Sequence, residues 1–151
     1  MRPIEIRNAR AADAHEITEM IGQLAAHHTD VARITVEDLI FLCFGPTPWM
    51  SLLIAEQDKK IVGYAALQRK TQLQFARRLM DVQHLYVVPK ARGTGVGRAL
   101  MDACGEVARA QRCDAVTLGV MAKNTNAQAF YSAIGFVPAE TSGAIQLLLR
   151  L

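Results

Sequence analysis

The chain has 151 residues, 51% of them hydrophobic, which is enough for a substantial core and predicts a single domain over residues 1–151. The net charge of +3, without basic residues interleaved with aromatic ones, argues against a nucleic-acid-binding protein, and no apolar run approaches the roughly 18 residues that span a bilayer. Residues 1–6 lack the apolar core of a signal peptide, and three cysteines without a Cys-x-x-Cys pair argue against a disulfide framework, so we expect a cytoplasmic protein.

The first third of the chain predicts one strand and two helices. Residues 2–8 alternate between apolar and polar side chains as a short strand does, and apolar residues then recur at helical spacing from Ala14 to Leu24. Thr35 precedes a second, shorter helical pattern and is a suitable N-cap residue. That helix must end before the Pro-rich loop that begins at Gly45.

The middle of the chain predicts a hairpin and then another strand. Two β-rich runs, residues 51–55 and 61–67, flank the polar residues 57–60. Residues 69–78 are polar and interrupt the pattern. Residues 82–88 then contain enough β-branched and aromatic side chains for a fourth strand, which the following proline ends.

The last third predicts two helices and two strands. Apolar positions from 99 to 110 mark the inner face of a helix, and residues 115–121 have the composition of a strand. Residues 127–134 predict a helix that ends at Gly135, and residues 145–149 predict a last apolar strand. The resulting order, β-α-α-β-β-β-α-β-α-β-β, is typical of a mixed α/β domain.

The segment from Arg92 to Arg98 predicts a glycine-rich turn between a strand and a helix. The first N–H groups of a helix lack carbonyl partners and the helix dipole is positive there, so such a turn favours an anion. Glycines at 93, 95 and 97 would let a diphosphate approach the amides. Their spacing matches neither the dinucleotide fingerprint nor the Walker pattern, which disfavours a nucleotide-binding module or a kinase-like enzyme.

Three motifs in chain order carry a family resemblance. Arg92, Gly95 and Gly97 occupy the fixed positions of the pattern Gln/Arg-x-x-Gly-x-Gly/Ala, residues 85–89 precede it as a Leu-x-Val-x-Pro-like phrase, and residues 124–136 follow as Asn-x-x-Ala-x-x-Phe-Tyr-x-x-x-Gly-Phe. In these motifs the chain resembles the GNAT family of N-acetyltransferases over essentially its whole length. The resemblance implies a single-domain α/β GNAT fold with a mixed, mostly antiparallel central sheet of six to seven strands. Helices would cover both faces, and the strands at 82–88 and 115–121 would splay apart.

The same resemblance implies acetyl-CoA as the cosubstrate and assigns residues to it. The pantetheine arm would pair with the main chain of Leu85, Tyr86 and Val87. The pyrophosphate would be held by the turn, that is by Arg92, Gly93, Thr94, Gly95, Val96, Gly97 and Arg98. Asn124 would contact the cofactor, and Tyr131 would donate a proton to the departing CoA thiolate. These last two residues are seven positions apart, about two helical turns, and therefore share a face.

Acetyl transfer needs a neutral amine, and hence a proton acceptor, but it needs neither an enzyme nucleophile nor a metal ion. We rank His84 first as this acceptor, because an unperturbed imidazole has a pKa of about 6.5, and Asp81 second. No metal site is expected. Direct attack by the amine in a ternary complex is expected instead of an acetyl-enzyme on a cysteine, since no Cys-His phrase surrounds Cys43, Cys104 or Cys113.

The acceptor side of the reaction is less sharply defined. Residues 34–39 and 53–56 resemble those of the diamine and polyamine N-acetyltransferases, although Gln83 and His84 stand where those enzymes carry adjacent acids. A cationic small-molecule amine is favoured by six acids that face only two basic residues between positions 10 and 45, namely Asp13, Glu16, Glu19, Asp30, Glu37 and Asp38.

Two alternatives stay open at this point. A non-catalytic acyl-CoA-binding sensor or interaction module of the same fold would carry the same turn. The family likeness also indicates a homodimer through the last strands, but residues 145–149 could equally be buried within one subunit.

Overall fold

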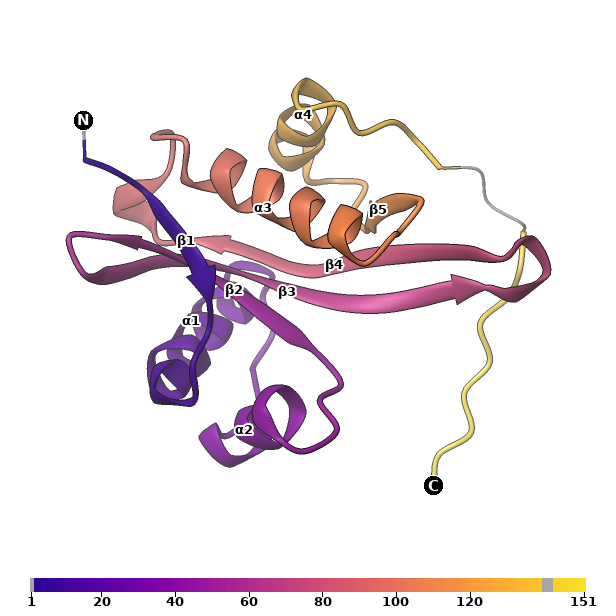
Figure 1. Ribbon diagram of the computed structural model, residues 1–151, viewed down its shortest axis with the longest axis horizontal. Coiled ribbons are helices and arrows are strands. Elements are labelled where there is room, and N and C mark those ends of the chain that lie inside the picture. The colour runs from indigo at the N-terminus through magenta and orange to yellow at the C-terminus, as the bar shows by residue number, and fades with distance from the viewer. Residues whose placement is uncertain (1, 140–142) are drawn as a thin grey trace. The chain divides into compact units, whose positions relative to one another are not determined.

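A five-stranded mixed sheet organises the first of the two units into which the computed structural model divides, Met1–Gly119 and Val120–Leu151. The structure describes residues 2–139 and 143–151. The first four strands pair antiparallel, and the fifth pairs with the fourth in parallel. They lie across the sheet in chain order (Figure 1), as β1 (Glu5–Asn8), β2 (Ser51–Gln57), β3 (Lys60–Gln72), β4 (Arg77–Val87) and β5 (Ala115–Leu118).

Helices cover both faces of this sheet, as the sequence predicted (Figure 1). On one face, α1 (Ala14–His27) and α2 (Val36–Phe44) contribute side chains to an apolar cluster with β2, β3 and β4. On the other face lies α3 (Val96–Ala110), whose buried residues include Val96, Leu100, Cys104 and Ala108. This four-residue spacing places them on one side of the helix. In the described part of the chain, no helix is long and apolar enough to cross a membrane.

The helix boundaries agree with the local signals in the sequence. Thr35 accepts the N–H of Asp38, whose carboxylate accepts the N–H of Thr35, so a capping box starts α2. That helix ends at Phe44, directly before Gly45. Short 3-10 turns connect other elements, as η1 (Ala11–Asp13), η2 (Leu73–Phe75) and η3 (Pro89–Ala91).

The prediction of six to seven strands was wrong. Residues 145–149 form no strand, and the side chains of Ile145 and Leu147 are 85% and 93% exposed. A strand needs a neighbouring strand to satisfy its main-chain groups, and apolar composition alone does not supply that partner. β5 is also shorter than the predicted 115–121, because it ends before Gly119, a residue type that is depleted in strands.

The prediction that residues 69–78 interrupt the strands was also wrong. β3 continues to Gln72 and β4 starts at Arg77, and these two residues pair across the end of a long hairpin. All side chains from 69 to 78 are exposed. A strand that is exposed on both faces needs no alternation of apolar and polar residues, so the sequence pattern by which a half-buried strand is predicted is not expected there.

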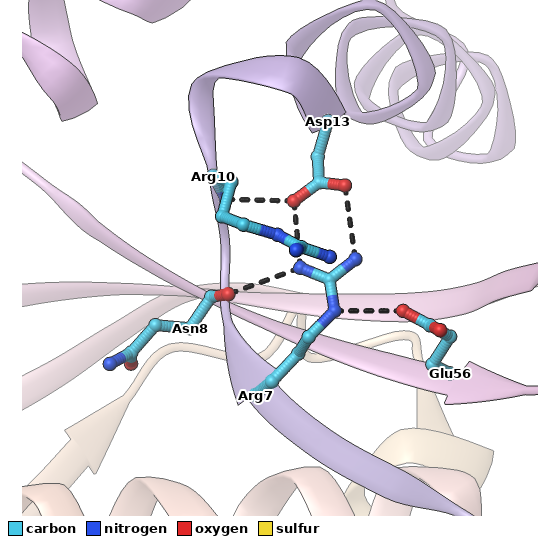
Figure 2. Close-up of polar contacts among 5 residues, drawn as sticks. All are labelled: Arg7, Asn8, Arg10, Asp13 and Glu56. Atoms are coloured by element: carbon cyan, nitrogen blue, oxygen red, sulfur yellow. Dashed lines mark hydrogen bonds and ion pairs between the residues drawn. The ribbon is translucent and has the colours of Figure 1, made fainter. Parts of the chain in front are cut away.

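An ion-pair network ties β1 to β2 and to the turn before α1 (Figure 2). Arg7 donates through Nη1 and Nη2 to the carboxylate of Asp13 at 2.8 and 3.0 Å, and through Nε to Glu56 at 2.7 Å. The Asp13 carboxylate also accepts the backbone N–H of Arg10. The hydrogen bonds from Arg7 hold the pKa of Asp13 below its usual value. One of the six acids near the N-terminus is thus structural.

Candidate active site

β4 continues beyond its pairing with β5. The two strands pair over four positions only, from Leu79 with Ala115 to Val82 with Leu118. Since β4 runs on to Val87 while β3 pairs with its other side, the edge of β4 that faces β5 has no neighbouring strand from residue 83 to 87 among the residues that the structure describes. Unpaired N–H and C=O groups along a strand edge accept another extended chain. The segment includes Leu85, Tyr86 and Val87, which the family resemblance assigned to the pantetheine arm.

The glycine-rich turn joins the end of β4 to α3. Gly93 and Gly95 have φ angles of 74° and 95°, which lie in the left-handed region that favours glycine. A Cβ placed on either residue would meet no described atom within 4 Å, so the main chain of the turn is open on that side. The helix starts at Val96, earlier than the predicted apolar face, and its first turn contains Gly97 and Arg98.

Within the part of the chain that the structure describes, no side chain caps the N-terminus of α3. Gly95 is the N-cap residue, and its carbonyl oxygen accepts the N–H of Ala99 at 3.0 Å. The amides of Val96, Gly97 and Arg98 precede this bond and have no carbonyl partner within an α-helix. Together with the positive end of the helix dipole, they form a site for an anion.

Side chains of the turn stabilise its shape. Arg92 donates through Nε to the carbonyl oxygen of Val87 at 2.8 Å, and its guanidinium carbon lies 5.6 Å from the centroid of the Tyr86 ring. The Thr94 hydroxyl donates to the carbonyl oxygen of Ala91 at 2.6 Å. The turn, η3 and the end of β4 are therefore held together.

His84 lies on β4 next to the proposed pantetheine segment. Its Nδ1 atom is 3.0 Å from the hydroxyl of Tyr64 on β3, and the imidazole is half-buried. Burial and, to a smaller extent, the charge of His28 lower the pKa of His84, so this imidazole is neutral at pH 7. Two residues further along β4, on the same face of the sheet, the hydroxyl of Tyr86 donates to Gln23 of α1 at 2.7 Å.

Asp81 lies further back on β4, where β5 still pairs with it. The hydroxyl of Thr117 donates to one of its carboxylate oxygens at 2.7 Å, and the ammonium group of Lys70 is 3.4 Å from the other. The carboxylate is thus held by a neighbour on each side. The two residues predicted as proton acceptors lie on the same strand in different surroundings.

Asn124 and Tyr131 belong to the second unit, Asn124 directly before α4 (Thr125–Ala133) and Tyr131 within it. Asn124 is the N-cap residue, and its side-chain oxygen accepts the N–H of Ala127 at 3.2 Å. The side-chain NH2 group of Asn124 is a hydrogen-bond donor and takes no part in this cap. The ring of Tyr131 lies between Phe130 and Phe136, with ring centroids 5.2 and 5.6 Å away. The capping role of Asn124 was not predicted from the sequence.

The cysteines differ in their surroundings. Cys104 is fully buried inside α3, and burial raises the pKa of its thiol to about 12. Burial also raises the pKa of the Cys43 thiol. Because the thiolate is the nucleophilic form, neither of these groups has the properties of a reactive cysteine.

Sequence reasoning missed the partners of the site residues. Tyr64 contacts His84 across 20 positions, and Gln23 contacts Tyr86 across 63. The strands pair with Tyr64 opposite Tyr86 and Ala66 opposite His84, so the contact of Tyr64 with His84 is a diagonal one, and no local pattern in the sequence indicates this register.

Comparison with known proteins gives one consistent family. A model of the acetyltransferase (GNAT) family matches residues 15–136. Thialysine N-epsilon-acetyltransferase of Bos taurus is 30% identical over 142 residues, which cover 87% of this chain and 83% of that protein. Spermidine/spermine N(1)-acetyltransferase-like protein 1 of Homo sapiens is 27% identical over 140 residues, which cover 87% of this chain and 20% of that protein.

Solved structures share the fold. The crystal structure of ribosomal-protein-alanine N-acetyltransferase from Brucella melitensis biovar Abortus 2308 superposes with a TM-score of 0.75 at 21% identity. The match covers 96% of this chain and 100% of that one. The predicted resemblance to this family and to its diamine and polyamine branch is confirmed.

Proposed function

Because the chain belongs to the acetyltransferase (GNAT) family, we propose that it transfers the acetyl group of acetyl-CoA to a small-molecule amine. The observation that carries the proposal is the junction of β4 and α3, where an unpaired strand edge leads into an uncapped helix N-terminus. A strand edge pairs with amide groups, and a helix N-terminus binds phosphate. CoA carries both kinds of group, because its pantetheine arm contains amides and ends at a pyrophosphate.

The residues of the turn fit a pyrophosphate. Gly93 and Gly95 leave space above the main chain, and the amides of residues 96–98 supply the donors. Arg92 and Arg98 add positive charge, while Thr94 stabilises the turn through its bond to the carbonyl of residue 91. In this proposal Leu85, Tyr86 and Val87 hold the pantetheine arm through their main chain, and Asn124 adds a contact from α4.

When bound, acetyl-CoA supplies a thioester that a neutral amine can attack directly. The burial of Cys104 and the raised pKa of its thiol support a reaction without an acetyl-enzyme. Tyr131 carries a phenol, which is a proton donor at neutral pH, and we assign to it the proton that the CoA thiolate takes up. The chain's own contribution is therefore to bind the cosubstrate, to orient the amine and to move two protons.

His84 and Asp81 are the two groups that would take the proton of the amine. His84 is neutral at pH 7 and lies directly before the pantetheine segment. Asp81 is a carboxylate that Thr117 and Lys70 already contact. Either group would act directly or through a water molecule.

The acceptor is proposed to be cationic, and three of the six N-terminal acids carry that part of the proposal. Asp13 is bound to Arg7 and Asp38 to the start of α2, so both have structural roles. The Glu19 carboxylate lies 3.3 Å from the imidazole of His15, so it already has a partner on α1. The acids left to attract an amine are exposed and belong to α1, to the loop after it and to α2, as Glu16, Asp30 and Glu37.

A thiol-release assay tests the function. The full chain is mixed with acetyl-CoA and a panel of diamines, polyamines, aminoglycosides, amino acids and peptide N-termini. Release of CoA thiol with at least one amine, together with the N-acetylated product by mass spectrometry, is the expected result. Binding of acetyl-CoA with no product from any amine would favour the non-catalytic acyl-CoA-binding module instead.

A homodimer is part of the proposal, with the exposed apolar side chains of the segment 145–149 at the contact. Ile145, Leu147, Leu148 and Leu149 are each at least 79% exposed. Burying them against a second copy would remove this apolar surface from water. Light scattering after size-exclusion chromatography should give twice the chain mass of 16.6 kDa, and a single-chain mass at micromolar concentration would contradict it.

A further inference from the structure

The contact between Tyr64 and His84 joins two side chains on one face of the sheet. His84 on β4 pairs with Ala66 on β3, and Tyr64 lies two positions earlier on β3, opposite Tyr86. Because Ala66 is small, the ring of Tyr64 can approach His84 diagonally across the strand pair. The hydroxyl ends 3.0 Å from Nδ1, and Tyr64 is 0% exposed.

The direction of this hydrogen bond follows from the burial of the phenol. Burial raises the pKa of Tyr64, so its hydroxyl keeps its proton. Among the described residues, Nδ1 of His84 is the hydrogen-bond partner of that hydroxyl. If the imidazole donated from Nδ1, the buried phenol proton would have no acceptor, and the full desolvation penalty of that group would follow.

We propose that Tyr64 is a positioning residue that donates to Nδ1 of His84 and so holds the imidazole with its proton on Nε2. The nitrogen that remains for the substrate is then a hydrogen-bond donor. His84 would hold an oxygen atom of the bound substrate, either the thioester carbonyl or an oxygen of the acceptor. Of the two candidates for the proton acceptor, Asp81 is the one that remains. The role in acetyl transfer rests on the proposed function, but the tautomer does not.

The groups around His84 agree with this assignment. His28, directly after α1, disfavours a positive charge on His84 through its electrostatic repulsion and so adds to the lowering of the His84 pKa by burial. From β3, the Tyr64 phenol stabilises the neutral ring. On β4 itself, the hydroxyl of Tyr86 donates to Gln23 and so is directed to α1. A proton added to His84 would have to go to Nδ1 and would displace the bond from Tyr64.

Nuclear magnetic resonance of the full chain labelled with 15N-histidine tests the proposal. Two-bond 1H–15N correlations show which ring nitrogen carries the proton, and the spectrum of a His84→Gln variant assigns the signal among the four histidines. The expected pattern is a protonated Nε2 and an unprotonated Nδ1 at neutral pH. A protonated Nδ1 with a bare Nε2 would overturn the proposal and restore His84 as the proton acceptor.

The variant Tyr64→Phe gives a second test, because the sign of the change in the His84 pKa depends on which of the two groups donates the hydrogen bond. Loss of a donor to neutral Nδ1 should raise the pKa of His84 by about 0.5 to 1. If the phenol instead accepted from Nδ1–H, the same variant would lower the pKa, and that result would contradict the proposal. Tyr86→Phe is the matched control, because it removes a hydroxyl two residues away that bonds to Gln23, and it should leave the tautomer unchanged.

The assay of acetyl transfer keeps this inference separate from the proposed function. A wild-type protein with the Nε2–H tautomer that acetylates no amine would overturn the proposed function and support the tautomer. In an active enzyme, Tyr64→Phe should change the pH profile of kcat/KM, which a merely structural role of the hydroxyl would not move. An unchanged profile would remove Tyr64 from the positioning of His84.

Discussion

Arg92 reaches back along the chain and donates from Nε to the carbonyl oxygen of Val87 at 2.8 Å. This bond joins the glycine-rich turn to the last residue of β4. The two surfaces that we assign to CoA, the strand edge and the helix N-terminus, are thereby held in one arrangement. The two Nη groups of the guanidinium are chemically suited to phosphate oxygens.

Arg92→Ala should weaken acetyl-CoA binding about 10- to 100-fold, the loss expected for one charged hydrogen-bond partner. Isothermal titration measures the change. Arg109→Ala is the matched control, since Arg109 lies near the other end of α3 in an exposed pair with Glu106. It removes the same charge and should change the affinity less than about twofold. Equal losses in both variants would show a general charge effect and contradict a specific contact.

Gly95→Ala should damage the site through the backbone alone. A Cβ at this position meets no described atom within 4 Å, but the φ angle of 95° is unfavourable for alanine and costs about 1–2 kcal/mol. We expect a lower free energy of unfolding or a shifted turn, and weaker acetyl-CoA binding. Gly22→Ala, in the interior of α1 with equal space around it, should stabilise the chain by about 0.5–1 kcal/mol instead. Unchanged binding by Gly95→Ala would exclude the turn from the site.

Tyr131→Phe should lower kcat by about 100-fold and leave the affinity for acetyl-CoA nearly unchanged, because the variant removes the hydroxyl that we assign as proton donor and keeps the aromatic ring. The rings of Phe130 and Phe136 that contact Tyr131 would contact phenylalanine equally well. Steady-state kinetics with the best amine of the panel, and titration with acetyl-CoA, measure the two quantities. An equal kcat in variant and wild type would remove Tyr131 from the mechanism.

Asp13→Ala should lower the free energy of unfolding by about 2–3 kcal/mol at neutral pH, because Arg7 loses one partner in a partly buried network. Glu106→Ala, which breaks an exposed pair, should cost less than about 0.5 kcal/mol. Urea denaturation measures both.

The contribution of Asp13 depends on pH in a defined direction. Its pKa is lowered in the folded chain, so the stabilisation is complete above the unfolded pKa of about 3.9 and is lost as pH falls through the folded value. The difference in stability between wild type and Asp13→Ala should therefore shrink between about pH 5 and pH 2. A difference that stays constant over this range would mean that the carboxylate charge is not what stabilises the network.

Local signals predicted the parts of the fold that local chemistry determines. The N-cap at Thr35, the left-handed Gly135 that follows the end of α4 and the glycine turn all depend on a few neighbouring residues, and the structure has each of them, although α4 spans Thr125–Ala133 instead of the predicted 127–134. Exposed hairpins and terminal strands depend on partners instead. Residues 69–72 and 77–78 form strand ends without a buried face, whereas residues 145–149 have a mostly apolar composition but form no strand.

The candidate site divides in the same way. The motif residues Arg92, Gly95 and Gly97 could be found because the turn brings them together in sequence. The bonds of His84 to Tyr64 and of Tyr86 to Gln23 depend on the register between β3 and β4 and on the packing of α1. No pattern within a short window of sequence contains that information. Tyr64, the residue that we propose sets the tautomer of His84, could therefore be identified only from the structure.

The central claim is that main-chain amides of the turn and of the β4 edge hold the CoA moiety. Titration of the 15N-labelled chain with acetyl-CoA tests it directly, since each backbone amide reports its own surroundings. The largest changes in chemical shift should fall on residues 93–98 and 85–87, and ATP or NAD at the same concentration should leave these signals unchanged. A folded protein whose turn amides do not respond to acetyl-CoA, or respond equally to ATP, would contradict the account.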